Sequence, residues 1–232
     1  AWDRLRNRVV WLALGELGLA YRDSRLKQSL TDAEVGGGRL WGPTGRWVVL
    51  DATFAVRQGS LSSRVAYSQL AGALGVELGE RVPERELREA VLGLRRSKGM
   101  VLDDADHDTW SAGSFFTNPI LTVAEAECLP EDAPRYPVTD HSQVVLGTKE
   151  APVVEGLVKT SAAWLIDHAG FTKGFTVETG APAGLSTKHV LALTNRGGAT
   201  GADLARLRDT VVAGVRERYG ITLVPEPVQV GF

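Results

Sequence analysis

The feature that most constrains the fold is a long amphipathic helix that the sequence predicts directly after Thr200. Thr200–Asp203 is a capping box with Asp in place of the usual Glu. Apolar residues then repeat along one helical stripe, which consists of Leu204, Leu207, Val211 and Val215. Gly220 ends the pattern, and short strands are expected at 190–194 and 222–224. Helix and strand therefore alternate in this half of the chain, and the predicted fold class is α+β.

Signals in the first half are weaker. Residues 8–13 and 47–56 are predicted strands, the second of them rich in β-branched and aromatic residues, and 67–74 is predicted to be a short helix. Pro83 opens a longer helix, whose apolar positions are Leu87, Val91 and Leu94. The glycines within 33–46 lack the flanking strand and helix of a phosphate-binding loop. We expect a flexible hairpin loop there.

Charge and hydropathy argue against two classes of protein. The 232 residues carry 26 basic and 28 acidic side chains, a net charge of −2, without a long block of one sign. This balance argues against a nucleic-acid binder that works by neutralising phosphates. No apolar run approaches the roughly 20 residues that span a bilayer, and no signal-peptide core is present, so membrane insertion is not expected.

The cysteine and histidine content favours neither disulfides nor a metal site. Cys128 is the single cysteine, so an intrachain disulfide cannot form and a reducing cytoplasm is expected. It lies in a predicted polar loop, 125–132, and is interpreted as structural. The four histidines do not form metal-ligand pairs and are also interpreted as structural: His107, His141, His168 and His189.

The segment Ser111–Pro119 is the most informative for chemistry. Ser114 stands between a glycine and two phenylalanines, so its hydroxyl is expected in a partly dry setting. Alone, such a serine is often only turn chemistry. Arg22 and Glu226 have similarly marked settings, although on pattern alone Arg22 could pair with the adjacent Asp23 on the surface, and Glu226 could be exposed.

Five ordered segments together resemble one family, the UDP-N-acetylenolpyruvoylglucosamine reductases (UDP-N-acetylmuramate dehydrogenases). The matching segments are Tyr21–Lys27, Gly113–Pro119, Lys159–Asp167, Ser186–His189 and Pro225–Glu226. Each alone is weak evidence, but the set in this order is specific.

The resemblance implies an FAD- and NADPH-dependent enzyme that reduces UDP-N-acetylglucosamine enolpyruvate to UDP-N-acetylmuramate. Ser114 matches the family's proton donor, and Arg22 and Glu226 match the pair that stabilises the enolate. To stabilise an anion, Glu226 must carry a proton. The three functional groups are expected to converge on one pocket.

Three further residues match the family's substrate contacts. Lys98 corresponds to a lysine that contacts the diphosphate, and Tyr67 and Asn118 correspond to other substrate contacts. On pattern alone, Asn118 before a proline is also ordinary turn chemistry. No cofactor-binding residue and no metal ligand is assigned.

Departures from the family suggest a partial chain. The Gly-rich segment that holds the flavin pyrophosphate in the family has no match here, and Val228 stands where many members have arginine. We expect residues 1–103 to be the later part of an FAD-binding domain that lacks its N-terminal part, 104–225 to be a substrate-binding α+β domain, and 226–232 to be a terminal strand that returns to the missing half. A long loop at 129–158, with one strand at 143–147, is interpreted as an insertion.

Two other functions remain open. The runner-up is a non-catalytic nucleotide-sugar binding module, which would keep Lys98 and Asn118 but never hold flavin. Another flavoprotein oxidase is less favoured, because those proteins lack the serine segment. As a reductase, the chain alone is expected to be inactive.

Overall fold

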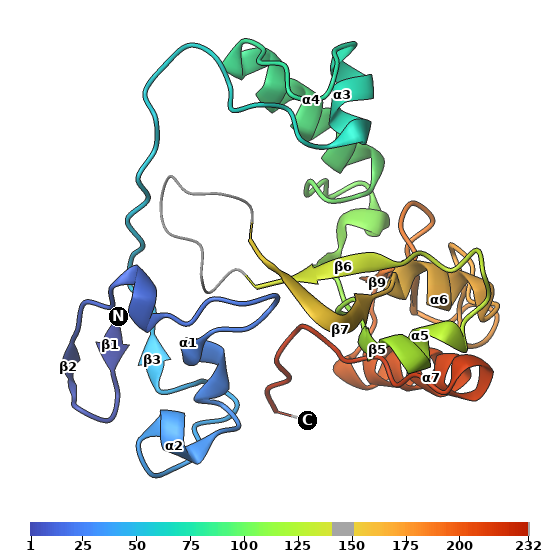
Figure 1. The fold of residues 1–232 in the computed structure, drawn as a ribbon. Helices are drawn as coiled ribbons and strands as arrows, with labels where there is room; N and C mark the ends of the chain where they lie inside the picture. The colour runs from blue at the N-terminus through green and yellow to red at the C-terminus, as the bar shows by residue number, and fades with distance from the viewer. Residues whose placement is uncertain (141–150, 232) are drawn as a thin grey trace. The chain divides into compact units, whose positions relative to one another are not determined.

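The computed structural model describes residues 1–140 and 151–231, which divide into two compact units. The first unit comprises Ala1–Phe54, Phe116–Trp164 and Leu223–Phe232, and the second comprises Ala55–Phe115 and Leu165–Thr222. Both contain helices and sheet, so the predicted α+β class is confirmed (Figure 1). The expected domain division at 103/104, and the return of 226–232 to a missing half, stay predictions.

A small antiparallel sheet opens the first unit, in the order β2-β1-β3. The strands are β1 (Trp2–Asp3), β2 (Arg8–Val9) and β3 (Trp47–Val48). In the register, Trp2 faces Val9 on one side and Val48 on the other. A 3-10 turn, η1 (Leu14–Glu16), and two short helices, α1 (Arg25–Gln28) and α2 (Ala33–Gly36), complete this part.

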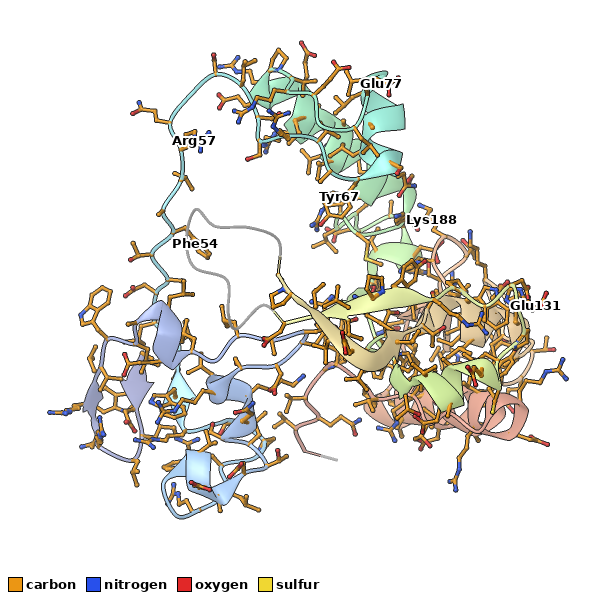
Figure 2. The ribbon with its side chains drawn as sticks, in the orientation of Figure 1. Phe54, Arg57, Tyr67, Glu77, Glu131 and Lys188 are labelled. Atoms are coloured by element: carbon orange, nitrogen blue, oxygen red, sulfur yellow. The ribbon has the colours of Figure 1, made fainter. Side chains whose placement is uncertain are left out.

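Several predictions for this region were wrong. The strands expected at 8–13 and 47–56 shorten to two residues each: the pairing ends at Val9, apart from the hydrogen bonds of Val10 with Ala1, and at Val48. Phe54 is 81% exposed, and Figure 2 shows it projecting from a stretch without helix or strand. The expected loop at 33–46 contains α2, because the Asp32 carboxylate accepts hydrogen bonds from two backbone amides at its start.

A second antiparallel sheet of the first unit has the order β5-β7-β6. Its strands are β5 (Ile120–Thr122), β7 (Val153–Lys159) and β6 (Tyr136–Thr139), with α5 (Val123–Glu127) following β5 (Figure 1). The prediction of a loop at 129–158 was therefore wrong at both ends. β6 was not predicted because prolines are unusual in strands. It is an edge strand, where Pro137 is tolerated. The strand expected at 143–147 lies outside the described residues, as does His141.

The second unit contains a three-stranded antiparallel sheet in the order β4-β9-β8. The strands are β4 (Ser111–Ser114), β9 (Ala192–Asn195) and β8 (Ala183–Leu185), and β8 and β9 contact α7 (Gly201–Tyr219). The predicted helix after Thr200 is confirmed, with its capping box and its stop at Gly220. Leu207, Val211 and Val215 on its apolar stripe are completely buried.

The second unit also contains two packed helices, α3 (Ser68–Leu74) and α4 (Glu84–Ser97), and both were predicted (Figure 1). A 3-10 turn, η2 (His107–Thr109), precedes β4. Helix α6 (Ala162–His168) follows Ser161, whose hydroxyl accepts a hydrogen bond from the Trp164 amide, and its residues up to Trp164 belong to the first unit. Residues 222–224 form no strand, and only an isolated bridge joins Pro225 to Phe116. No helix in the described ranges is both long and apolar enough to cross a membrane.

Candidate functional site

Arg22 lies at the tip of a tight turn in the first unit. Two backbone hydrogen bonds between Ala20 and Asp23 close this turn, at 3.0 and 3.3 Å. Arg22 has φ +54°, a left-handed conformation that only one other non-glycine residue of the described chain, Asn7, adopts. The Lys27 ammonium donates to the Arg22 carbonyl at 3.0 Å and holds the strained backbone from the neighbouring α1. Strain of this kind gathers at functional sites in proteins.

Glu226 is the ion-pair partner of Arg22, with 3.0 Å between Arg22 Nε and Glu226 Oε2. The side chains are 52% and 33% exposed. Asp23, the alternative partner, instead accepts the Gln28 side-chain amide at 2.7 Å and the Ser24 backbone amide at 2.8 Å. The Arg22 guanidinium therefore pairs with Glu226, which is distant in sequence, and not with the adjacent Asp23.

The backbone before Glu226 is fixed by the segment that follows β4. The Thr117 amide and hydroxyl both donate to the Val224 carbonyl, at 3.0 and 3.3 Å, beside the Phe116–Pro225 bridge. These contacts place Glu226 next to the Arg22 turn. An open depression of about 490 Å³ lies over the pair, and Lys27 and Asp23 also line it.

Asn118 belongs to the same region of the first unit. Its backbone amide donates to the Tyr21 hydroxyl at 3.2 Å, and its side-chain oxygen accepts the Ala162 amide at 3.0 Å, at the start of α6. The Lys159 ammonium lies 4.8 Å from the centre of the Tyr21 ring, a cation–π contact. Asn118 thus connects the Arg22 turn to α6, and its role in substrate binding stays a prediction.

Ser114 lies in the second unit, at the end of β4. The register against β9 shifts between Ser111 and Ser114, and Gly113 within this irregularity has φ +81°. Such bulges redirect the side chains that follow them. Ser114 Oγ lies 3.4 Å from His189 Nε2. Sequence reasoning missed this neighbour, although His189 belongs to the Ser186–His189 segment that already matched the family.

The segment that carries His189 is held by buried polar groups. The completely buried Ser186 hydroxyl accepts the backbone amides of Lys188 and His189, at 3.0 and 3.2 Å. Asp108, 4% exposed, accepts hydrogen bonds from the amide and hydroxyl of Thr187. Burial alone would raise the pKa of Asp108, but the Thr187 hydrogen bonds and the charge of a nearby arginine outweigh it and hold the pKa below its usual value.

Lys98 and Tyr67 also lie in the second unit. Lys98 follows α4 and donates to the Gln69 side chain at 2.9 Å. Tyr67 precedes α3 and is 75% exposed (Figure 2). Burial lowers the pKa of His189, and the positive charges of Lys98 and Lys173 lower it further.

The six predicted site residues therefore fall into two groups. Arg22, Asn118 and Glu226 are together in the first unit, whereas the second unit holds Tyr67, Lys98 and Ser114. Convergence of Ser114 with the Arg22–Glu226 pair stays a prediction. Within the described ranges, no group of three or more His, Cys, Asp or Glu side chains could hold a metal ion.

Comparison with known proteins identifies the family of the chain. Residues 104–230 match the family model described as the C-terminal domain of UDP-N-acetylenolpyruvoylglucosamine reductase. Proteins of that name from Cutibacterium acnes, Streptomyces avermitilis and Thermobifida fusca are 48%, 50% and 49% identical over 230, 242 and 234 residues. These matches cover 99–100% of the chain but 53–58% of the relatives, so the chain spans about half of their length. The chain belongs to the UDP-N-acetylenolpyruvoylglucosamine reductase family.

Proposed function

We propose that this chain is the substrate-binding and proton-donating part of an enzyme that reduces UDP-N-acetylglucosamine enolpyruvate to UDP-N-acetylmuramate, in the cytoplasm, for peptidoglycan synthesis. The observation that carries this proposal is the Arg22–Glu226 pair. Its members come from opposite ends of the chain, and Arg22 is held in a strained turn. A partly exposed guanidinium beside a carboxyl group suits a substrate that is itself a carboxylate.

In this proposal Arg22 binds the carboxylate of the enolpyruvyl group and stabilises the enolate that forms on it. The ion pair with Glu226 is made through Arg22 Nε, and a guanidinium has four further N–H donors for an anion. When the substrate carboxylate binds Arg22 in place of Glu226, the released Glu226 carboxylate takes up a proton from water and donates a hydrogen bond to the same enolate.

Ser114 then supplies the proton that completes the product. Its O–H bond breaks, and the electron pair of the enolate becomes the new C–H bond at the carbon next to the carboxylate. The serine oxygen, left negative, recovers a proton from water. A serine hydroxyl is a weak acid, but an enolate is a strong enough base to accept its proton when both are well placed.

FAD and NADPH are the cofactors in this proposal, and reduced FAD supplies the hydride. Two of the three glycines at 36–38 do not fit its pyrophosphate. A Cβ added to Gly36 would lie 3.0 Å from the Trp41 ring, and one added to Gly37 would lie 2.5 Å from the Leu5 side chain. Gly36 and Gly37 therefore face protein and do not form an open cradle for a phosphate. We infer that residues 1–103 complete their FAD-binding domain only with a portion that the longer relatives have.

A chimera tests the proposal. It joins this chain to the part of the Streptomyces avermitilis relative that the chain does not span, with the intact relative as the control. We expect a yellow, FAD-bearing protein that oxidises NADPH only when the enolpyruvyl sugar is present. A chimera that binds UDP-sugar but does not turn over, while the intact relative does, would instead favour the non-catalytic binding module.

A further inference from the structure

His189 is a hydrogen-bond partner of the Ser114 hydroxyl. The two residues are 75 positions apart, and 3.4 Å separates His189 Nε2 from Ser114 Oγ. This is a long hydrogen bond, and catalytic contacts of this kind often shorten when substrate binds. The contact lies entirely within the second unit.

His189 lies outside any helix or strand, but hydrogen bonds and an ion pair fix the backbone around it. The Ser186 hydroxyl accepts the His189 amide, Asp108 holds Thr187, and Lys188 pairs with Asp106. The Phe115 amide next to Ser114 donates to the Leu191 carbonyl at 2.7 Å. The backbone is therefore fixed on both sides of the Ser114–His189 contact, and a fixed backbone is one condition for orienting a hydroxyl.

The surroundings of the ring favour its neutral form. Burial is the main cause, and the positive charges of Lys98 at the end of α4 and of Lys173 in the loop after α6 act in the same direction. A neutral imidazole has one N–H donor and one acceptor nitrogen. If Nε2 carried no hydrogen, it would attract the serine proton toward itself and away from a substrate.

We propose that His189 is a positioning residue for Ser114: its Nε2–H donates a hydrogen bond to Ser114 Oγ, which leaves the serine O–H directed at the substrate. The same N–H stabilises the serine oxygen as its proton leaves. This inference rests on the proposed function of Ser114 as proton donor. Loss of one such preorganised donor typically costs about 10²-fold or more in the step that it serves.

The first test uses the 232-residue chain itself and needs no activity. Nitrogen-15 NMR of imidazole-labelled protein resolves the ring nitrogens of only four histidines, which single His→Gln variants assign. We expect a protonated Nε2 on neutral His189, and a shift of that signal in Ser114→Ala but not in the matched variant Ser97→Ala. An unprotonated Nε2 at neutral pH, or no response to Ser114→Ala, would overturn the proposal.

The second test measures the two half-reactions in the chimera. His189→Ala should slow reoxidation of reduced flavin by the enolpyruvyl sugar about 10²-fold and leave reduction by NADPH unchanged. His189→Gln, whose amide N–H can replace Nε2–H, should recover part of the rate, and His168→Gln serves as the control. If the wild-type chimera is reoxidised as fast as the intact relative and both His189 variants match that rate, the inference about His189 is wrong, whereas the proposed function stands. If the intact relative reacts with the enolpyruvyl sugar and the wild-type chimera does not, the proposed function fails. The NMR experiment then still shows whether His189 Nε2–H donates a hydrogen bond to Ser114.

Discussion

The buried pair of Asp3 and Arg46 offers a stability test of the unit that carries Arg22. Asp3 is 1% exposed, and Arg46 donates to both of its carboxylate oxygens, at 3.0 and 2.7 Å. The Arg46 amide also donates to the buried Ser29 hydroxyl, directly after α1. The pair therefore ties β1 to the segment that follows the Arg22 turn.

The expected energy follows from the pKa of Asp3. The hydrogen bond from Arg46 is the main cause that lowers this pKa from 3.8 to about 2. A fall of that size corresponds to about 2 kcal/mol of unfolding free energy. Because the folded-state pKa is the lower one, the contribution is complete above about pH 4 and is lost as the pH falls toward about 2.

Removing one member of a buried pair costs about 3–5 kcal/mol. We therefore expect Asp3→Asn to lower the unfolding free energy by about 2–4 kcal/mol at pH 7, and by less at pH 3.

Urea unfolding at pH 7 and pH 3 measures this difference, with fluorescence of the buried Trp41 and Trp47 as the signal from this unit. Asp209→Asn is the matched control. Asp209 pairs with Arg208 at 2.7 Å but is 67% exposed, so its loss should cost less than about 1 kcal/mol. Equal losses in the two variants, or a loss in Asp3→Asn that does not shrink at pH 3, would refute the reasoning.

Three predictions concern function. In the chimera, Ser114→Ala should leave flavin reduction by NADPH intact and slow reoxidation by the enolpyruvyl sugar by about 10²–10⁴-fold in single-turnover measurements; equal losses in both half-reactions would indicate a packing role instead. Glu226→Gln keeps a hydrogen-bond donor but cannot ionise, so it should retain more reoxidation rate than Glu226→Ala, and identical rates would contradict a protonated Glu226. The 232-residue chain alone should bind FAD weakly or not at all in a fluorescence titration, and sub-micromolar affinity would show that the cofactor site is misplaced.

The sequence predicted those elements correctly whose determinants lie within the segment itself. Helix α7 has an apolar stripe between the capping box at Thr200 and the stop at Gly220, and α4 has its apolar positions in one segment after Pro83, so both were predicted. The strand expected at 47–56 failed because pairing depends on a partner elsewhere in the chain, and among residues 1–140 and 151–231 only Trp47 and Val48 of this segment have one. β6 was missed because Pro137 is unusual in a strand, and only its edge position explains why it is tolerated.

The site shows the same division between local and distant causes. Family motifs identified Arg22 and Glu226, but their ion pair depends on the contacts of Thr117 with Val224, which no local pattern indicates. His189 was interpreted as structural because a single histidine next to a strand has no distinguishing pattern. The role that we propose for it depends on the distance to Ser114, a property of the fold.

The left-handed backbone at Arg22 gives a final prediction, because it reverses the usual order of alanine and glycine. Non-glycine residues in this conformation cost roughly 1–2 kcal/mol. Arg22→Ala and Arg22→Gly lose the same ion pair, so their difference reports the backbone alone, and the glycine variant should be more stable by about 1 kcal/mol. At the exposed helical position Glu217 in α7, alanine should instead be more stable than glycine by about 1 kcal/mol. Urea unfolding of the four variants measures both differences. If alanine is at least as stable as glycine at position 22, the turn is not strained, and the strain no longer supports a functional role for Arg22. If glycine is the more stable residue at position 22, the backbone there favours glycine over any other residue. The arginine then costs stability, and a functional role of its side chain explains why it is present.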